Sequence, residues 1–268
     1  MLRCPFRLSE LNKSYKLGCP ARTFNIFVSH DRRGMSSTRG HPATTNDKSL
    51  IKFDDFAVLI KEGKLFGEEE FYFQLEEKQQ DGSIKKVWYR GCYTLVDGGY
   101  LSWPTLIAPL SAYLTYDEMR WSKWLESMRK DVECTFGILK VRFQVLKKGI
   151  SLHGTDACDN TFLCCLALHN MILDADVAAR ATDDDVEDTD SMDDDDSFVD
   201  DETPMNLDLP DVLKDFADDN GVICVTKLSL KYFQSKLIEH HSIQHHAGKL
   251  IWPSTSGLPP PDNIVEHS

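Results

Sequence analysis

Two carboxylates have surroundings that suit phosphoryl-transfer chemistry. Asp97 ends a short apolar run and precedes Gly98–Gly99, which predicts a carboxylate at a strand end where a ligand can approach closely. Glu133 lies at the edge of an apolar stripe on a predicted helix, and 35 residues separate the two acids. Two-metal phosphoryl transfer needs carboxylates from separate elements that converge on ions about 3.5–4 Å apart. The alternatives are an Asp that caps a turn and a Glu in a solvated ion pair.

The predicted helix around Glu133 is basic. Residues 120–148 contain eight Lys or Arg side chains against three acidic ones, a net charge of +5. Such a surface suits DNA phosphates, and the residues that we expect there are Arg129, Lys130, Lys140 and Arg142. A solvated helix face is the alternative interpretation.

The elements that must position these side chains follow from periodicity and turn signals. We expect a strand at 23–29 that returns at 35–39, and a helix at 48–62 that Asn46–Asp47 caps and Gly63 ends. Asp81–Gly82 predicts a hairpin. The remaining predicted elements are strands at 71–75, 84–89 and 93–96 and helices at 117–146, 159–173 and 228–243. Strands followed by helices indicate a mixed α/β fold.

The charge is divided unevenly along the chain. Residues 174–219 contain 20 acidic and two basic side chains, whereas the rest of the chain has a net charge of +5. We therefore expect three parts: a domain at 1–173, an acidic disordered linker at 174–219, and a C-terminal helical segment with a tail at 220–268. The acidic part could shield the basic helix, bind basic nuclear proteins, or act as a passive linker.

Several classes of protein are disfavoured by composition. The eight cysteines include no CxxC pair, which argues against structural zinc and a disulfide scaffold and favours reduced thiols inside the cell. We find no apolar run near 18 residues and no signal-peptide core, so we expect neither a membrane span nor secretion by that route.

Other candidate residues are weaker. The cluster of His240, His241, His245 and His246 has the helical spacing of a Zn²⁺ or Ni²⁺ site, but solvated surface is the more common explanation. His169 is predicted to be a satisfied core or supporting histidine. Cys134 is predicted to be a small core residue.

Several ordered motifs resemble those of a known family. TLVDGGYLSWPTLIAPL (94–110) and RWSKWLESMRKDVECTFGILKVRFQVL (120–146) resemble the second and third acidic motifs of PIF/Harbinger-type transposases, which belong to the DDE endonuclease superfamily. The further motifs that fit this family are FNIFVSHDRRGM (24–35), TTNDKS (44–49), ALHNMIL (167–173) and KLIEHH…WP (236–253).

The resemblance implies an RNase H-like fold in which three acids bind Mg²⁺ or Mn²⁺ for DNA strand cleavage and transfer. Asp97 matches the second acid and Glu133 the third, as catalytic residues and metal ligands. The family also implies a nuclear location, DNA as substrate and a Myb-like partner protein. The oligomeric state is not predicted.

The first acid of the family lies in a Gly-x-x-Asp-x-x-His motif that these 268 residues do not contain. Because Cys4–Pro5 corresponds to a segment just after that motif, we expect a truncated core without its first strand and an inactive chain. Neither Asp31 nor Asp47 matches the missing acid. The alternatives are a non-catalytic remnant that binds DNA or protein, and a translated fossil without function.

Overall fold

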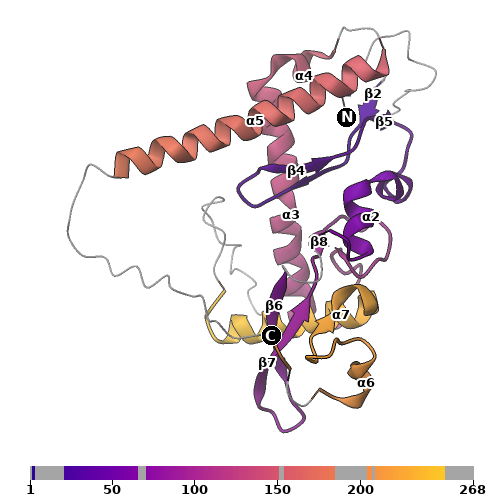
Figure 1. Ribbon diagram of the computed structural model, residues 1–268, viewed down its shortest axis with the longest axis vertical. Coiled ribbons are helices and arrows are strands. Elements are labelled where there is room, and N and C mark those ends of the chain that lie inside the picture. Colours follow the sequence, from indigo (N-terminus) through magenta and orange to yellow (C-terminus); the bar gives the residue numbers. More distant parts are fainter. Residues whose placement is uncertain are drawn as a thin grey trace, which may run out of the picture.

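A long helix, α3 (Tyr116–Arg142), runs through the middle of the molecule (Figure 1). The computed structural model describes residues 2–3, 21–65, 71–150, 154–184, 204–206 and 209–250. A β-hairpin and the C-terminal helix lie at one end of α3, and two further helices lie at the other (Figure 1). Helices and small sheets alternate along the chain, which confirms the mixed α/β architecture.

The predicted hairpin is present and longer than expected. Strands β6 (Tyr72–Lys78) and β7 (Ile84–Arg90) pair antiparallel over their whole length. At the turn, Gly82 has a φ of 82°, a left-handed conformation that glycine adopts without steric cost. The Asp81 carboxylate accepts hydrogen bonds from the backbone N–H and the hydroxyl of Ser83. The Asp-Gly signal therefore located this turn correctly.

The third strand of this sheet was not predicted. Strand β10 (Ile223–Cys224) pairs parallel with β7, and Asn206 extends the same edge. The side-chain amide of Asn206 accepts from the Trp88 backbone N–H at 2.7 Å and donates to the Trp88 carbonyl at 2.9 Å. Asn206, from within the expected linker, and Ile223–Cys224, which follow it, thus complete this edge of the sheet.

The described C-terminal residues share a hydrophobic core with the hairpin and α3. They form α6 (Asp211–Lys214), the 3-10 helix η3 (Val225–Lys227) and α7 (Leu230–His246), the last of which was predicted. The buried core side chains here are Leu75, Val87, Tyr89, Ile107, Trp121, Leu125, Ile223, Val225, Leu228, Phe233 and Leu237. Residues between Ile223 and Ile238 of the expected C-terminal helical segment therefore pack against the hairpin and α3, and the division of the chain into three parts stays a prediction.

The predicted strand at 93–96 pairs only locally. Strand β8 (Thr94–Leu95) lies parallel to β9 (Leu106–Ile107), and among the described strands it pairs with no other. The largest described sheets have three strands. One continuous RNase H-like sheet is not seen among the described residues, so that part of the fold stays a prediction, as does the missing first strand.

The strand expected at 23–29 is divided between two sheets. Strand β2 (Ala21–Thr23) pairs with β1 (Leu2–Arg3) and β5 (His41–Pro42), whereas β3 (Ile26–Val28) pairs with β4 (Gly34–Ser37). At the junction, the Asn25 carbonyl accepts from the Thr38 N–H at 2.9 Å and the Thr38 hydroxyl accepts from the Asn25 N–H at 3.0 Å. These bonds satisfy the backbone where the chain changes sheets.

The helix expected at 48–62 is interrupted. It consists of α1 (Asp47–Leu50), the 3-10 helix η2 (Ile51–Phe53) and α2 (Asp55–Lys61). The break occurs because Asp54 is the N-cap of α2: its extended backbone cannot continue a helix, and its carboxylate accepts from the Ala57 N–H. The predicted Asn46 cap of α1 is confirmed.

The long helix predicted at 117–146 is two helices. Thr115 and Glu118 form a capping box that starts α3, and the chain leaves the helical conformation at Phe143 before α4 (Gln144–Lys148). The break turns α4 toward a second core, whose buried members are Phe24, Ile26, Leu139, Leu146, Ile150, Cys158, Phe162, Cys165 and Leu166. A third cluster comprises Ile51, Ala57, Val96 and Leu106.

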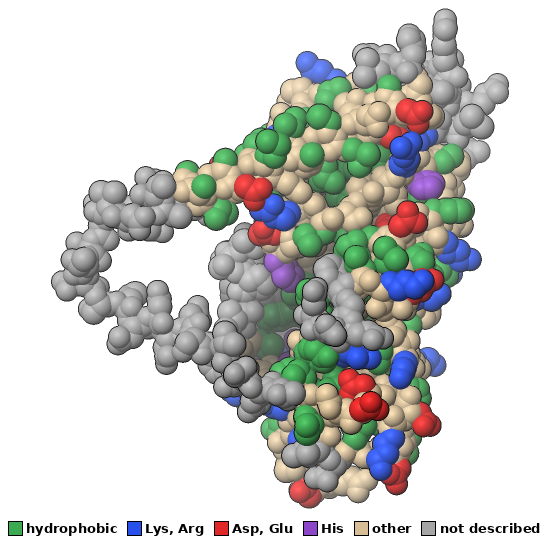
Figure 2. Space-filling view, viewed as in Figure 1, with side chains coloured by type: hydrophobic (Ala, Val, Ile, Leu, Met, Phe, Trp, Pro, Cys, Tyr) green, Lys and Arg blue, Asp and Glu red, His purple; other side chains and the backbone are tan. Residues whose placement is uncertain are grey.

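Helix α5 (Thr155–Asp184) extends well beyond the predicted 159–173. It therefore includes the start of the expected linker. Helix α6 lies inside that linker near its end, and β10 follows it. Residues 185–203 lie outside the described part. The first half of α5 packs in the second core, whereas its far end projects from the body with Met171 and Val177 each 64% exposed (Figures 1 and 2).

The apolar composition of α5 corrects one exclusion. By length and composition alone, Thr155–Ala179 is long and apolar enough to cross a membrane, although the sequence has no comparable uninterrupted run. Core helices of soluble proteins pass the same test. Phe162 and His169 of this helix are fully buried against other elements, which gives the apolar composition of its first half a packing role.

Candidate functional site

Asp97 lies where the parallel pair β8–β9 ends. The Val96 N–H still donates to the Ile107 carbonyl at 2.9 Å, and the chain then turns at Gly98–Gly99. The Asp97 carboxylate accepts from the Gly98 N–H at 2.6 Å and its side chain is 63% exposed. A Cβ added at Gly98 would meet nothing within 4 Å. The predicted strand-end carboxylate with open space beside it is therefore present.

Glu133 lies on the solvent-facing side of α3. The same helix buries Leu125, Thr135 and Leu139 on its opposite face, and the Glu133 side chain is 64% exposed. One turn further, a Cβ added at Gly137 would have no neighbour within 4 Å. The surface next to Glu133 is therefore open rather than closely packed.

Arg129 brings the two acids together. Its Nη1 atom lies 3.7 Å from Oδ2 of Asp97 and 3.5 Å from Oε1 of Glu133. Arg129 and Glu133 are four residues apart on α3, whereas Asp97 comes from a different element, so only the tertiary fold can produce this convergence. Exposed ion pairs of this kind contribute about 0–1 kcal/mol to stability. The arrangement is thus a solvent-open pair of carboxylates held around one cation.

Comparison of the sequence with models of known protein families identifies the family. A model of the plant transposon protein family matches residues 25–179, which is more than half of the chain. The chain belongs to the plant transposon protein family. No match is found among curated proteins or among solved structures. Membership shows a transposase-derived protein, and the match includes Asp97, Arg129 and Glu133.

A buried polar network that sequence reasoning missed lies beside the acids. The Tyr100 hydroxyl donates to Oδ1 of Asn25 at 3.0 Å, and the Asn25 amide donates to Asp54 at 2.6 Å. Burial, with the nearby charges of Asp47, Asp54 and Asp97, raises the pKa of Tyr100 to about 12. Burial also raises the pKa of Asp54, which the Asn25 bond opposes. This network fixes the backbone behind Asp97, and the helix cap at Asp54 is its only local signal.

The expected DNA contacts divide into two kinds. Lys130 is exposed and Lys140 is half-buried, whereas Arg129 and Arg142 make contacts within the chain. Arg142 donates to Nδ1 of His169 at 2.9 Å. Lys130 therefore matches the simple expectation of an exposed cation, whereas Arg129 and Arg142 are engaged within the chain.

The His-Asn pair of the family motif fastens a hairpin to α5. His169 is fully buried, and its Nε2 bonds the Arg32 carbonyl at 3.0 Å. Since a guanidinium only donates, Nδ1 of His169 accepts from Arg142 and Nε2 carries the proton. Asn170 donates to the Gly34 carbonyl at 2.8 Å and accepts from the Gly34 N–H at 2.9 Å. The prediction of a satisfied core histidine is confirmed.

The C-terminal histidines do not converge. His240 accepts from the Glu76 N–H at 2.9 Å. His241 is buried edge-on against Trp124, and neither of its ring nitrogens has a hydrogen-bond partner among the described residues. His245 bonds Arg120. Over the described ranges, no group of three His, Cys, Asp or Glu residues is placed to hold a metal ion.

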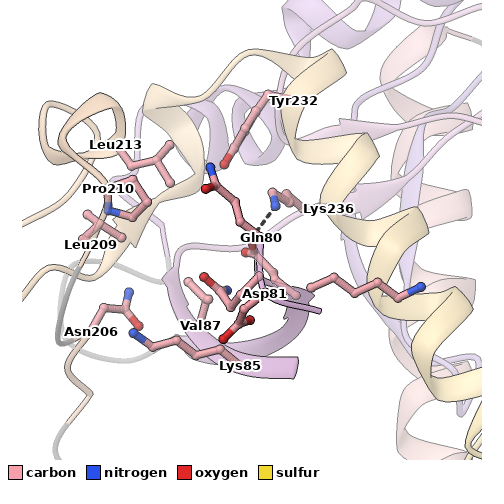
Figure 3. A pocket seen from close by; sticks show the side chains of 13 residues that line it. Gln80, Asp81, Lys85, Val87, Asn206, Leu209, Pro210, Leu213, Tyr232 and Lys236 are labelled. Carbon is pink, nitrogen blue, oxygen red and sulfur yellow. Dashed lines mark ion pairs between the residues drawn. The ribbon is translucent and has the colours of Figure 1, made fainter. Parts of the chain in front are cut away.

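Two further features lie away from the acids. Cys134 is exposed, so its expected role as a core residue is wrong. A cavity of about 470 Å³ lies between the β6–β7 turn and a wall formed by Asn206, Leu209, Pro210 and Leu213 (Figure 3). In the wall of this cavity, Lys236 pairs with the buried Glu77 at 2.5 Å, so the positive charge of Lys236 is already neutralised within the protein. We therefore place the candidate site at Asp97 and Glu133.

Proposed function

We propose that this transposase-derived protein is a PIF/Harbinger-type DDE nuclease in which Asp97 and Glu133 are two of the metal-binding acids, and that it cleaves DNA poorly or not at all because these 268 residues lack the first acid of that family. One observation carries the proposal: two exposed carboxylates from separate elements meet at a single cationic group. Structural acids of this chain, such as Asp159 and Glu77, are instead buried and fully paired. Exposure and convergence together favour a binding role.

The donor set suits Mg²⁺ or Mn²⁺. Carboxylate oxygens are hard ligands, and Mg²⁺ commonly uses one or two carboxylates together with water and substrate phosphates. Asp97 and Glu133 would hold the ion, and the open backbone at Gly98 leaves room beside them. Bound there, a divalent cation supplies Lewis-acid activation of the attacking oxygen and stabilises charge on the phosphate.

The residues of this chain would position DNA around that centre. Lys130 is next to Arg129 on α3 and exposed, and Lys140 lies further along the same helix. Both can contact DNA phosphates without breaking an ion pair that the structure contains. Arg142 would act indirectly, because it is bonded to His169. DNA as substrate and a nuclear location are part of this proposal.

The test is metal-dependent nicking of supercoiled DNA by the full chain. Because the first acid is missing, we expect the unchanged protein to nick DNA in Mg²⁺ or Mn²⁺ only slightly above background, and we expect Asp97→Asn and Glu133→Gln to abolish whatever metal-dependent nicking it shows. The matched control is Glu126→Gln, an exposed acid of the same helix that contacts neither residue of the site. Metal-dependent nicking above background that Asp97→Asn and Glu133→Gln both retain would refute the assignment.

A non-catalytic binding module is the second candidate. Arg129 already neutralises part of the charge of both acids, and α5 presents an exposed apolar end that a partner protein could cover. A folded chain that binds DNA, or a Myb-like partner, without cleaving DNA in either metal would favour this candidate. Its binding would be unaffected by Asp97→Asn.

A further inference from the structure

The position of Arg129 has a consequence for metal binding. We propose that Arg129 is a built-in counter-ion that occupies the space between Asp97 and Glu133 and that a divalent cation must displace, so that Arg129 sets the affinity of the site for metal. This inference rests on the proposed function, since it concerns the same two acids. It assigns Arg129 a positioning and regulating role rather than a direct contact with DNA.

The geometry places one guanidinium nitrogen in contact with both acids. Nη1 of Arg129 lies 3.7 Å from Asp97 and 3.5 Å from Glu133, so the carboxylates are directed at the same point. Two negative groups converging on one point repel each other unless a cation lies between them. In the described structure, Arg129 is that cation, and it keeps the acids together without metal.

The contacts are loose enough to be exchanged. Charge-assisted hydrogen bonds between nitrogen and oxygen are about 2.7–2.9 Å long, and both contacts of Arg129 are clearly longer. Its Nε atom is buried and has no hydrogen-bond partner among the described residues. The guanidinium is thus held mainly by electrostatic attraction to the two acids. A doubly charged ion that attracts the same acids more strongly can replace it.

The burial pattern anchors Arg129 close to the site. Its side chain is 22% exposed, whereas the two acids are more than 60% exposed. The stem therefore packs against the protein while the acids remain accessible to solvent ions. A displaced guanidinium would stay within reach and would return when the metal leaves. Metal binding and the Arg129 ion pairs are therefore mutually exclusive.

The experiment measures Mn²⁺ binding to the full chain by the loss of the electron paramagnetic resonance signal of free Mn²⁺. The double variant Asp97→Asn, Glu133→Gln provides the baseline, because the 20 acidic side chains of 174–219 can also attract Mn²⁺. Above this baseline we expect Arg129→Gln to bind about tenfold more tightly than the unchanged protein, since a repelling charge is removed at contact distance. Arg129→Lys, which keeps the charge, should bind close to the unchanged protein.

The matched control is Lys123→Gln, which removes one exposed positive charge from the same helix away from the acids. We expect it to change Mn²⁺ affinity by less than about threefold, as exposed distant charges are screened. Equal effects of Lys123→Gln and Arg129→Gln would overturn the inference, and so would an Arg129→Gln affinity at or below that of the unchanged protein. Thermal unfolding of each variant verifies that it folds.

The outcomes separate the two proposals. If Asp97→Asn abolishes the specific Mn²⁺ binding while Arg129→Gln leaves it unchanged, the metal site stands and the counter-ion role is refuted. If the double variant binds as much Mn²⁺ as the unchanged protein and Arg129→Gln, neither proposal holds. If only Arg129→Gln binds Mn²⁺ above the baseline, the counter-ion role is supported in its strongest form.

Discussion

Carboxylates differ in burial and pairing between two regions beside α3, one at its N-terminal end next to α7 and the other, the candidate site, near its middle. Near α7, Glu77 is 7% exposed as a side chain and bonds both the Tyr89 hydroxyl and Lys236 at 2.5 Å. At the candidate site, Asp97 and Glu133 are more than 60% exposed and share Arg129 at longer distances. Where the charge stabilises the fold it is buried and fully paired, and where chemistry is proposed it is exposed and incompletely paired.

In the region next to α7, helix side chains also complete the edge of a sheet. Glu239 accepts from the Lys78 N–H at 2.7 Å and His240 from the Glu76 N–H, so α7 covers donors that an edge strand would otherwise expose. At the candidate site, by contrast, the two exposed acids share a single cationic side chain, Arg129, among the described residues. We therefore expect substitutions next to α7 and substitutions at the candidate site to differ strongly in their effects on stability.

The largest effect is expected for Lys236→Met. It leaves the buried Glu77 without its cation, and breaking a buried pair in this way costs about 3–5 kcal/mol of unfolding free energy. Urea unfolding monitored by circular dichroism measures the loss. The control is Lys214→Met, whose partner Asp211 is exposed, and no measurable change is expected there. Similar results for both variants would contradict the comparison.

A comparable effect at acid pH is expected from His241. Burial, with the charges of His245, Arg120 and His240, lowers the pKa of this histidine to about 4, which Asp117 only partly opposes. The unfolded chain then binds a proton that the folded protein does not, between about pH 6.5 and 4.

Stability should consequently fall as the pH is lowered through this window, by about 3 kcal/mol when the pH reaches 4. The measurement is the unfolding free energy across that range for the unchanged protein and for His241→Leu. The difference between the two curves gives the contribution of His241 to the pH dependence, separate from that of the other titratable groups. We expect His241→Leu to lose less stability on acidification, and parallel curves would refute the prediction.

A smaller effect is expected where α5 holds the β3–β4 hairpin. Asn170→Ala removes both hydrogen bonds to the Gly34 backbone, and unsatisfied backbone groups at this half-buried position cost about 2 kcal/mol. Met171→Ala, at the adjacent exposed position of the same helix, is the control. Thermal unfolding compares the two, and an equal loss would show that the hairpin does not depend on this clamp.

Local signals in the sequence predicted the elements that depend on local chemistry. Asp81–Gly82 located the hairpin, and the 3.6-residue periodicity located α7. Strand β10 could not be found in this way, because two residues contain too little pattern and pair with a strand more than 130 residues earlier. The breaks at Asp54 and Phe143 were missed since apolar periodicity continues across both.

The candidate site was predictable in part for the same reason. The spacing of Arg129 and Glu133 on one helix is visible in the sequence, whereas the contact of Arg129 with Asp97 depends on how β8 lies against α3. The network of Tyr100, Asn25 and Asp54 joins three distant segments and has little local signature. Residue types indicated the chemistry, and tertiary packing supplied the partner.

The smallest effect on stability is expected at the acids themselves. Asp97→Asn and Glu133→Gln each remove an exposed contact with Arg129, and exposed pairs of this kind change the unfolding free energy by about 0.5 kcal/mol or less. Differential scanning calorimetry without metal should therefore give nearly unchanged melting temperatures. A loss of unfolding free energy as large as that of Lys236→Met would mean that the two acids stabilise the fold. The contrast between the candidate site and the region next to α7 would then be refuted. Unchanged stability with lost metal binding would instead place their role in binding alone.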